Sequence, residues 1–144
     1  AMKRMLILLG ACLVLLAGAV LYVAVSFEIE ATPRGSLLYR TGIPRALKDL
    51  PVMAVCDRPH YSYYGQDGER LPYGALRYDS SAGRAAIFAG TEAALAERGC
   101  TADTRQDDWF DMTCGRYTRF VIGVTAGEPC DTVTIEMIGE QPWP

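Results

Sequence analysis

The two residues of this chain whose types and spacing could supply a nucleophile and a base are Cys56 and His60, in the stretch "CDRPH". His60 is the only histidine, so any Ser–His or Cys–His catalysis would have to use it. Catalytic partners usually meet through the fold rather than through such short spacing, and Cys56 is expected to be oxidised. We therefore expect His60 to lie on the surface and contact a partner.

A second candidate for chemistry is the acidic cluster "DDWFDM", with Asp107, Asp108 and Asp111. It could bind calcium or supply paired acid and base carboxylates, but it lacks the glycine-bearing loop and terminal Glu of an EF-hand. The chain also contains no G-x-S-x-G, phosphate-binding glycine loop, H-E-x-x-H or C-x-x-C-H motif. We interpret the cluster as a solvated acidic turn and expect no catalytic residue, cofactor or metal site. A small envelope enzyme is the least favoured function.

Aromatic residues gather in "HYSYYGQDGERLPYG", where tyrosines on a rigid turn could form a protein-binding surface. Trp143, between prolines near the C-terminus, could provide a second contact, although an unanchored tail is the default. The alternatives are that the tyrosines simply pack on a sheet, or that they bind cell-wall carbohydrate. The candidate partner-binding residues are Arg58, His60, Tyr61, Tyr63, Tyr64, Tyr73 and Trp143.

The element that would position this surface in the cell is the uncharged run from Met5 to Phe27, which follows Lys3 and Arg4. As a helix it would reach roughly 34 Å, enough to cross a hydrocarbon core of roughly 30 Å. The positive-inside rule keeps Lys3 and Arg4 in the cytoplasm and places Glu28 outside. We expect residues 1–27 to be a single-pass signal anchor in a bacterial inner membrane, in contact with lipid through residues 5–27.

Two cleaved alternatives compete with the anchor. A lipoprotein signal ending before Cys12 would have only residues 5–11 as its apolar core. A signal peptide cut after Ala19 would leave apolar residues 20–27 on the mature chain. The anchor uses the whole run and is preferred, although whether cleavage occurs stays open.

Small residues recur along one face of the expected anchor. Gly10, Ala17 and Ala24 are spaced by seven, with Ala11 and Gly18 beside them. Such a face allows another helix to approach closely. It favours a helix partner in the membrane, although membrane helices are in general rich in small residues.

Charge excludes one class of partner. Of 14 Lys and Arg residues, Lys3 and Arg4 precede the apolar run, which leaves residues 28–144 with 12 basic against 17 acidic side chains and a net charge of about −5. Nucleic-acid binding needs a basic face and is not expected. The absence of Asn and the strong preference for Arg over Lys suggest a GC-rich bacterial genome. No small-molecule substrate is indicated.

Outside the apolar run there are four cysteines, and an even number in an exported domain predicts two disulfides. No pair has the C-x2-4-C spacing of a structural zinc site. If residues 109–114, 117–125 and 130–138 are successive antiparallel strands, Cys114 and Cys130 lie roughly 20 Å apart and cannot pair. Of the two remaining connectivities, Cys56–Cys130 with Cys100–Cys114 is preferred because it needs the shorter loop.

Together these patterns predict an α+β protein: a connector at residues 28–42, then a domain at residues 43–144. Two short helices cover an antiparallel sheet whose best strand signals are the alternating residues 117–125 and 130–138. The remaining expected elements are a helix at 45–50, a buried strand at 52–56, a tight turn at Asp67-Gly68, a hairpin of 75–79 with 84–88, and a helix at 92–98 capped by Thr91 and stopped by Gly99.

The functional expectation is a membrane-anchored periplasmic domain that binds another protein and performs no catalysis. Its partner is either a membrane or envelope complex, which makes the protein an accessory subunit, or an incoming toxin, which makes it an immunity or inhibitor protein. The sequence does not separate these two. A cell-wall or carbohydrate-binding module is the alternative.

Overall fold

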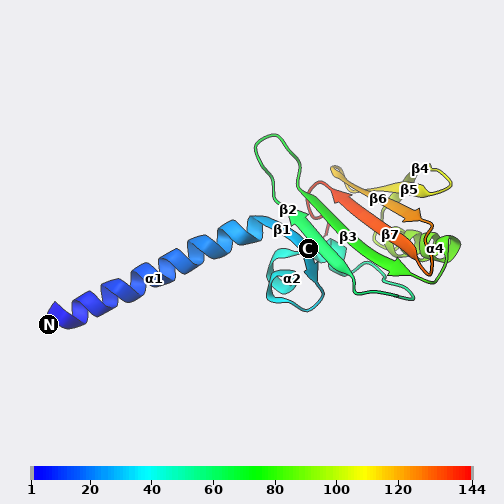
Figure 1. Cartoon of the computed structure of the whole chain (residues 1–144). Coiled ribbons are helices and arrows are strands. Elements are labelled where there is room, and N and C mark those ends of the chain that lie inside the picture. The colour runs from blue at the N-terminus through cyan, green and yellow to red at the C-terminus, as the bar shows by residue number, and fades with distance from the viewer. Residues whose placement is uncertain (1, 144) are drawn as a thin grey trace.

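The computed structural model describes residues 2–143 as a long N-terminal helix that leads into an α+β domain (Figure 1). The helices are α1 (Met2–Phe27), α2 (Leu37–Gly42), α3 (Arg45–Lys48) and α4 (Arg84–Ala96). The strands are β1 (Glu28–Pro33), β2 (His60–Tyr64), β3 (Tyr73–Ser80), β4 (Thr101–Arg105), β5 (Trp109–Cys114), β6 (Thr118–Thr125) and β7 (Asp131–Ile138). The expected α+β class is confirmed.

One antiparallel sheet of seven strands, in the order β1-β2-β3-β7-β6-β5-β4, forms the centre of the domain. Side chains alternate between its two faces, so one face gathers the apolar residues. Across this face Leu76 pairs with Ile135, and Ile135 with Ile122; all three are fully buried. The meander β5-β6-β7 has the order and the strand positions that the alternating pattern predicts.

The helices of the domain pack on this apolar face. Phe88 of α4 meets Phe110 of β5 edge to face, with ring centroids 5.1 Å apart. Tyr39 of α2 meets Tyr61 of β2 in the same way at 4.8 Å. The opposite face carries polar and half-exposed side chains, so the sheet divides the domain into a covered and an open side.

Helix α1 extends away from the domain (Figure 1). Its segment Ile7–Ala24 is long and apolar enough to cross a membrane. The described part of α1 contacts only β1 and α2 appreciably. The chain therefore combines an apolar N-terminal helix with a disulfide-bonded domain.

Two expected strands are wrong. Residues 52–56 form no strand: Val55 makes a single bridge to Ser80, and Ala54 has a positive φ of 41°, which turns the chain out of an extended path. Val55 is 43% exposed instead of buried. Residues 84–88 belong to α4 and not to a hairpin, although residues 75–79 do lie in strand β3.

Helix α4 is longer than the helix expected at residues 92–98. Its buried residues Ile87, Phe88, Thr91 and Leu95 follow a helical period, and they face the sheet. Thr91 therefore lies inside the helix, fully buried, and does not cap it. Gly99 does end this region with a positive φ of 81°.

Residues 28–42, expected to be a connector, are part of the folded unit. They contain β1, which pairs with β2, and α2, whose N-terminus is capped by the Ser36 hydroxyl.

The sequence patterns did not predict strand β4. Its residues are all exposed, so they show no alternation of buried and exposed positions that would indicate a strand. The Asp67-Gly68 turn exists, but at the tip of a longer β2–β3 loop closed by a bridge between Asp67 and Arg70.

The structure joins Cys56 to Cys130 and Cys100 to Cys114, with Cα atoms 6.6 Å and 4.3 Å apart. This is the connectivity that the meander argument prefers. Cys12, in α1, is a free and exposed cysteine.

Candidate functional site

The expected partner surface is divided by the sheet. Tyr61 is fully buried on the covered face, and Tyr63, two residues along the same strand, is half-buried on that face. Trp143 is partly buried and stacks on Phe120, with ring centroids 6.0 Å apart. Tyr61 therefore belongs to the core, which corrects its assignment to a contact surface, while Trp143 packs against the core and keeps part of its surface exposed.

Tyr64 and Tyr73 lie together on the open face, at the end of the sheet nearest α1. Their ring centroids are 6.1 Å apart, and their hydroxyls donate to Glu30 at 3.2 Å and Glu136 at 2.9 Å. Burial, reinforced by the hydrogen bond to Glu136, raises the pKa of Tyr73 to about 12. Both hydroxyls thus form hydrogen bonds within the domain. A carbohydrate-binding surface on the open face would contain only the rings of Tyr64 and Tyr73 from the tyrosines of residues 60–74.

Arg58 and His60 lie at the opposite end of the domain. Strand β1 leaves α1 at Glu28, opposite Tyr64, and ends at Pro33, opposite His60. His60 in turn pairs with Arg77 of β3. We call this end of the sheet, farthest from α1, the distal end.

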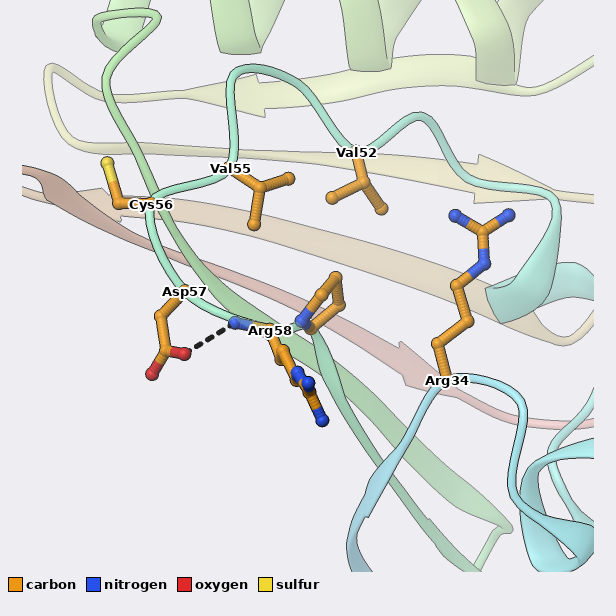
Figure 2. Close-up of a pocket in the computed structure, with 7 residues that line it drawn as sticks. Arg34, Val52, Val55, Cys56, Asp57 and Arg58 are labelled. Carbon is orange, nitrogen blue, oxygen red and sulfur yellow. Dashed lines mark hydrogen bonds between the residues drawn. The ribbon is translucent and has the colours of Figure 1, made fainter.

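A hollow of about 410 Å³ opens at the distal end (Figure 2). Figure 2 shows the apolar side chains of Val52 and Val55 along one side, with Arg34 and Arg58 at its margin. We call it the distal hollow, and it is lined by Arg34, Val52, Val55, Cys56, Asp57, Arg58 and Pro59.

A smaller hollow of about 210 Å³ adjoins the distal hollow through Asp57 and Arg58. It adds His60 and Arg77 from the open face of the sheet, and Asp79, whose carboxylate accepts a hydrogen bond from Thr132 at 2.8 Å. The segment 57–58 is thus a ridge between two depressions.

Neither arginine of the distal hollow forms an ion pair with the described part of the chain. Within residues 2–143, no carboxylate lies within ion-pair distance of Arg34 or Arg58. The nearby Asp57 carboxylate accepts the backbone N–H of Arg58 at 2.6 Å instead. Burial raises the pKa of Tyr61 to about 12, and the positive charge of Arg34 partly opposes that rise. Both guanidinium groups are exposed and can receive a carboxylate from outside.

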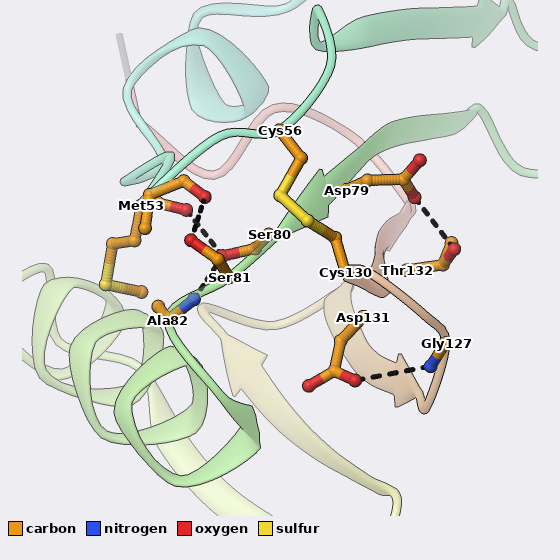
Figure 3. The surroundings of a disulfide bond; sticks show 11 residues. Met53, Cys56, Asp79, Ser80, Ser81, Ala82, Gly127, Cys130, Asp131 and Thr132 are labelled. Carbon is orange, nitrogen blue, oxygen red and sulfur yellow. Dashed lines mark hydrogen bonds between the residues drawn. A yellow bond between two sulfur atoms is a disulfide. The ribbon is translucent and has the colours of Figure 1, made fainter.

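The Cys56–Cys130 disulfide positions the apolar side of this hollow (Figure 3). It joins residue 56 to the start of β7, while hydrogen bonds tie the same segment to the end of β3. The Cys56 N–H donates to the Asp79 carbonyl at 2.8 Å, and the Ser80 hydroxyl donates to the Met53 carbonyl at 2.6 Å. Val55 is therefore held in an exposed position on a segment that makes only one isolated β-bridge and belongs to no strand.

The geometry around His60 offers no activated nucleophile. Its Nδ1 lies 3.2 Å from the Ala31 carbonyl, and the Cys56 sulfur is bonded to Cys130. The hydroxyl of Ser62, on the same strand, accepts the Ala31 N–H at 3.1 Å. In the described part of the chain, no three His, Cys, Asp or Glu side chains are placed to hold a metal ion.

The acidic cluster at residues 107–111 is not a uniform solvated turn. Asp107 and Asp108 are exposed, but Asp111 is only 2% exposed. Its carboxylate accepts the Thr104 N–H at 2.7 Å and the Arg119 Nε at 2.6 Å. Asp111 therefore fastens the irregular edge strand β4 to the sheet, a role that the sequence pattern did not indicate.

The small residues of α1 all lie on exposed parts of the helix. Adding a Cβ at Gly10 or Gly18 would meet no atom within 4 Å. The packing face formed by Gly10, Ala11, Ala17, Gly18 and Ala24 thus stays a prediction about another helix.

No protein-family model matches this chain, and no curated protein or solved structure matches it at a significant level. The class of protein is therefore defined by its own architecture. It is a small α+β domain with two disulfides, joined to an apolar N-terminal helix of membrane-spanning length.

Proposed function

We propose that this protein is a single-pass bacterial inner-membrane protein whose α1 holds a non-catalytic, protein-binding domain in the periplasm. The disulfides are compatible with an oxidising compartment. The basic residues before the apolar run favour a cytoplasmic N-terminus. The partner is a subunit of an envelope complex or a toxin.

The observation that carries this proposal is the composition of the distal hollow. It combines an exposed apolar side chain, Val55, with two guanidinium groups that have no acidic partner in the described chain. Residues 28–144 are acidic as a whole, so a cationic and apolar depression is a distinct feature of this surface. Interfaces commonly combine an apolar centre with arginine.

The chemistry of the hollow defines the partner segment. A segment with an apolar side chain next to an acidic one would bury the first against Val52 and Val55 and pair the second with Arg34 or Arg58. Arginine suits this task because its planar guanidinium can hold a carboxylate through two hydrogen bonds. The distal location leaves the hollow accessible while α1 stays in the bilayer.

Photo-crosslinking in living cells tests the proposal. A photoreactive amino acid at Val55 of the full chain is expected to capture a discrete partner that mass spectrometry identifies. The same amino acid at Gln106, exposed in the β4–β5 turn, serves as the control position and should capture no such product.

Charge reversal then tests the role of the hollow. Arg58→Glu should remove most of the Val55 product, while Arg40→Glu, the same charge change at an exposed position in α2, should leave it intact. Equal crosslinking from Val55 and Gln106, or equal effects of the two reversals, would show that the distal hollow is not the binding site.

A further inference from the structure

The β2–β3 loop and the β5–β6 turn present apolar side chains at the end of the domain nearest α1. Outside α1, the large hydrophobic residues that the structure describes as exposed are Leu37, Val55, Leu71 and Tyr117. Val55 belongs to the distal hollow. Leu71, in the loop at residues 65–72, is 55% exposed, and Tyr117, in the turn at residues 115–117, is 72% exposed.

These two tips form one surface because both meet Gly139 at the end of β7. The Gly139 N–H donates to the carbonyl of Pro72 at 2.8 Å, directly after Leu71. Gly139 has a φ of 111°, and a Cβ at this position would collide with the carbonyl oxygen of Tyr117. Only glycine allows this close approach, so the loop and the turn are held side by side.

The same end of the domain is fixed close to α1. Helix α1 ends at Phe27 and β1 begins at Glu28, so no spacer separates them. The hydroxyl of Tyr22, within the apolar span, donates to that of Thr41 in α2. Figure 1 shows α1 leaving the domain on the side where the β2–β3 loop projects. If α1 crosses a bilayer, this end faces the lipid headgroups.

We propose that the Leu71–Tyr117 surface contacts the lipid headgroup region of the membrane that α1 crosses. Leucine and tyrosine suit this region, where an apolar body can enter lipid while a hydroxyl stays in water. The inference rests on the membrane anchoring in the proposed function. It adds that the domain lies on the bilayer in one orientation, with the distal hollow pointing away.

The charges at this surface indicate whether membrane contact depends on anionic lipid headgroups or on apolar contact with the lipid. Arg70 and Arg116 adjoin Leu71 and Tyr117, but Asp67, Glu69 and Glu140 are exposed in the same region. The acidic side chains offset the attraction of the two arginines for anionic lipid. Contact should therefore depend on the two apolar side chains, and it should change little with salt or with the anionic lipid fraction.

A fluorescent depth measurement on the full chain tests this inference. In a Cys12→Ser background, Glu69→Cys or Gln106→Cys is labelled with a small environment-sensitive dye, without reductant so that both disulfides stay closed. The chain is reconstituted in phosphatidylcholine vesicles with and without brominated lipid. Quenching by bromine should be several-fold stronger at position 69 than at position 106, and Leu71→Ser with Tyr117→Ser should reduce it to the position 106 level.

Flotation of the same vesicles after an alkaline wash reports the anchor independently. A chain that floats but is quenched equally at positions 69 and 106 contradicts the lipid-contacting surface and leaves the anchor intact. A chain that fails to float contradicts both the anchor and this surface. Quenching at position 69 that survives the double serine substitution would also overturn the role of Leu71 and Tyr117.

Discussion

Thr91 and Thr118 are both buried, but among the described residues only the Thr118 hydroxyl has a hydrogen-bond partner. Thr91 lies in α4, fully buried, and its hydroxyl has no hydrogen-bond partner within residues 2–143. Thr118, at the start of β6, donates its hydroxyl to the Glu140 carbonyl. A buried hydroxyl without a partner costs free energy, while a satisfied one contributes to stability.

This difference predicts opposite responses to the same substitution. Thr91→Val should leave the free energy of unfolding unchanged or raise it by about 1 kcal/mol, and Thr118→Val should lower it by about 1 kcal/mol. Urea denaturation of the full chain in detergent, followed by circular dichroism, measures both. A loss for Thr91→Val as large as that for Thr118→Val would mean that the Thr91 hydroxyl is satisfied after all.

For single residues, the sequence predicted least well which face of the sheet each tyrosine occupies. The aromatic stretch at residues 60–73 indicated a hairpin, but not which alternate residues face the helices. That choice depends on α2, which contributes Tyr39 against Tyr61, and on β1, which pairs with β2. Neither element has a strong sequence signal. Arg58 and His60 are exposed, as the sequence predicted. Arg58 lies in a loop and His60 at the first position of β2, so their exposure depends less on which face of the sheet each strand residue occupies.

At the scale of elements, the two disulfides have different tasks. Cys100–Cys114 spans 14 residues and lies in the core, while Cys56–Cys130 spans 74 residues and holds the irregular segment beside the distal hollow. Closing the longer loop restricts the unfolded chain more. The chain-entropy model gives about 4.5 kcal/mol for the longer loop and about 3 kcal/mol for the shorter one.

Removing either disulfide should lower the stability of the domain, but only the loss of Cys56–Cys130 should also abolish partner binding at the distal hollow. Cys56→Ala with Cys130→Ala should lower the free energy of unfolding by about 4.5 kcal/mol and abolish the crosslink from Val55. Cys100→Ala with Cys114→Ala serves as the control: it should lower stability by about 3 kcal/mol and keep the crosslink under conditions where the domain stays folded. Urea denaturation and crosslink yield are the measurements, and loss of the crosslink in both folded variants would contradict a local role for Cys56–Cys130.

The strands β5 to β7 could be predicted because strict alternation over successive segments leaves one antiparallel arrangement. Residues 84–88 were wrongly predicted to be a strand, because a short apolar run does not distinguish a strand from the first turns of a helix. The longer spacing of Ile87, Phe88, Thr91 and Leu95 was the helical signal. The distal hollow could not be predicted, since it depends on the positive φ of Ala54 and on a disulfide between distant residues.

For the whole molecule, the structure places the apolar helix and the distal hollow at opposite ends of one domain. The direct connection of α1 to β1 leaves no spacer between the apolar helix and the sheet. A periplasmic domain held in this way would present Arg34, Val55 and Arg58 to partners away from the bilayer. The topology that we propose has a cytoplasmic N-terminus, α1 in the membrane and the folded domain outside.

Cysteine accessibility in spheroplasts tests this topology most directly. In a Cys12→Ser background, a membrane-impermeant maleimide should label Gln106→Cys in intact spheroplasts and label Lys3→Cys only after the membrane is opened. Both variants should stay in the membrane pellet after an alkaline wash. Labelling of Lys3→Cys but not Gln106→Cys before permeabilisation, or release of the chain by the wash, would contradict the account.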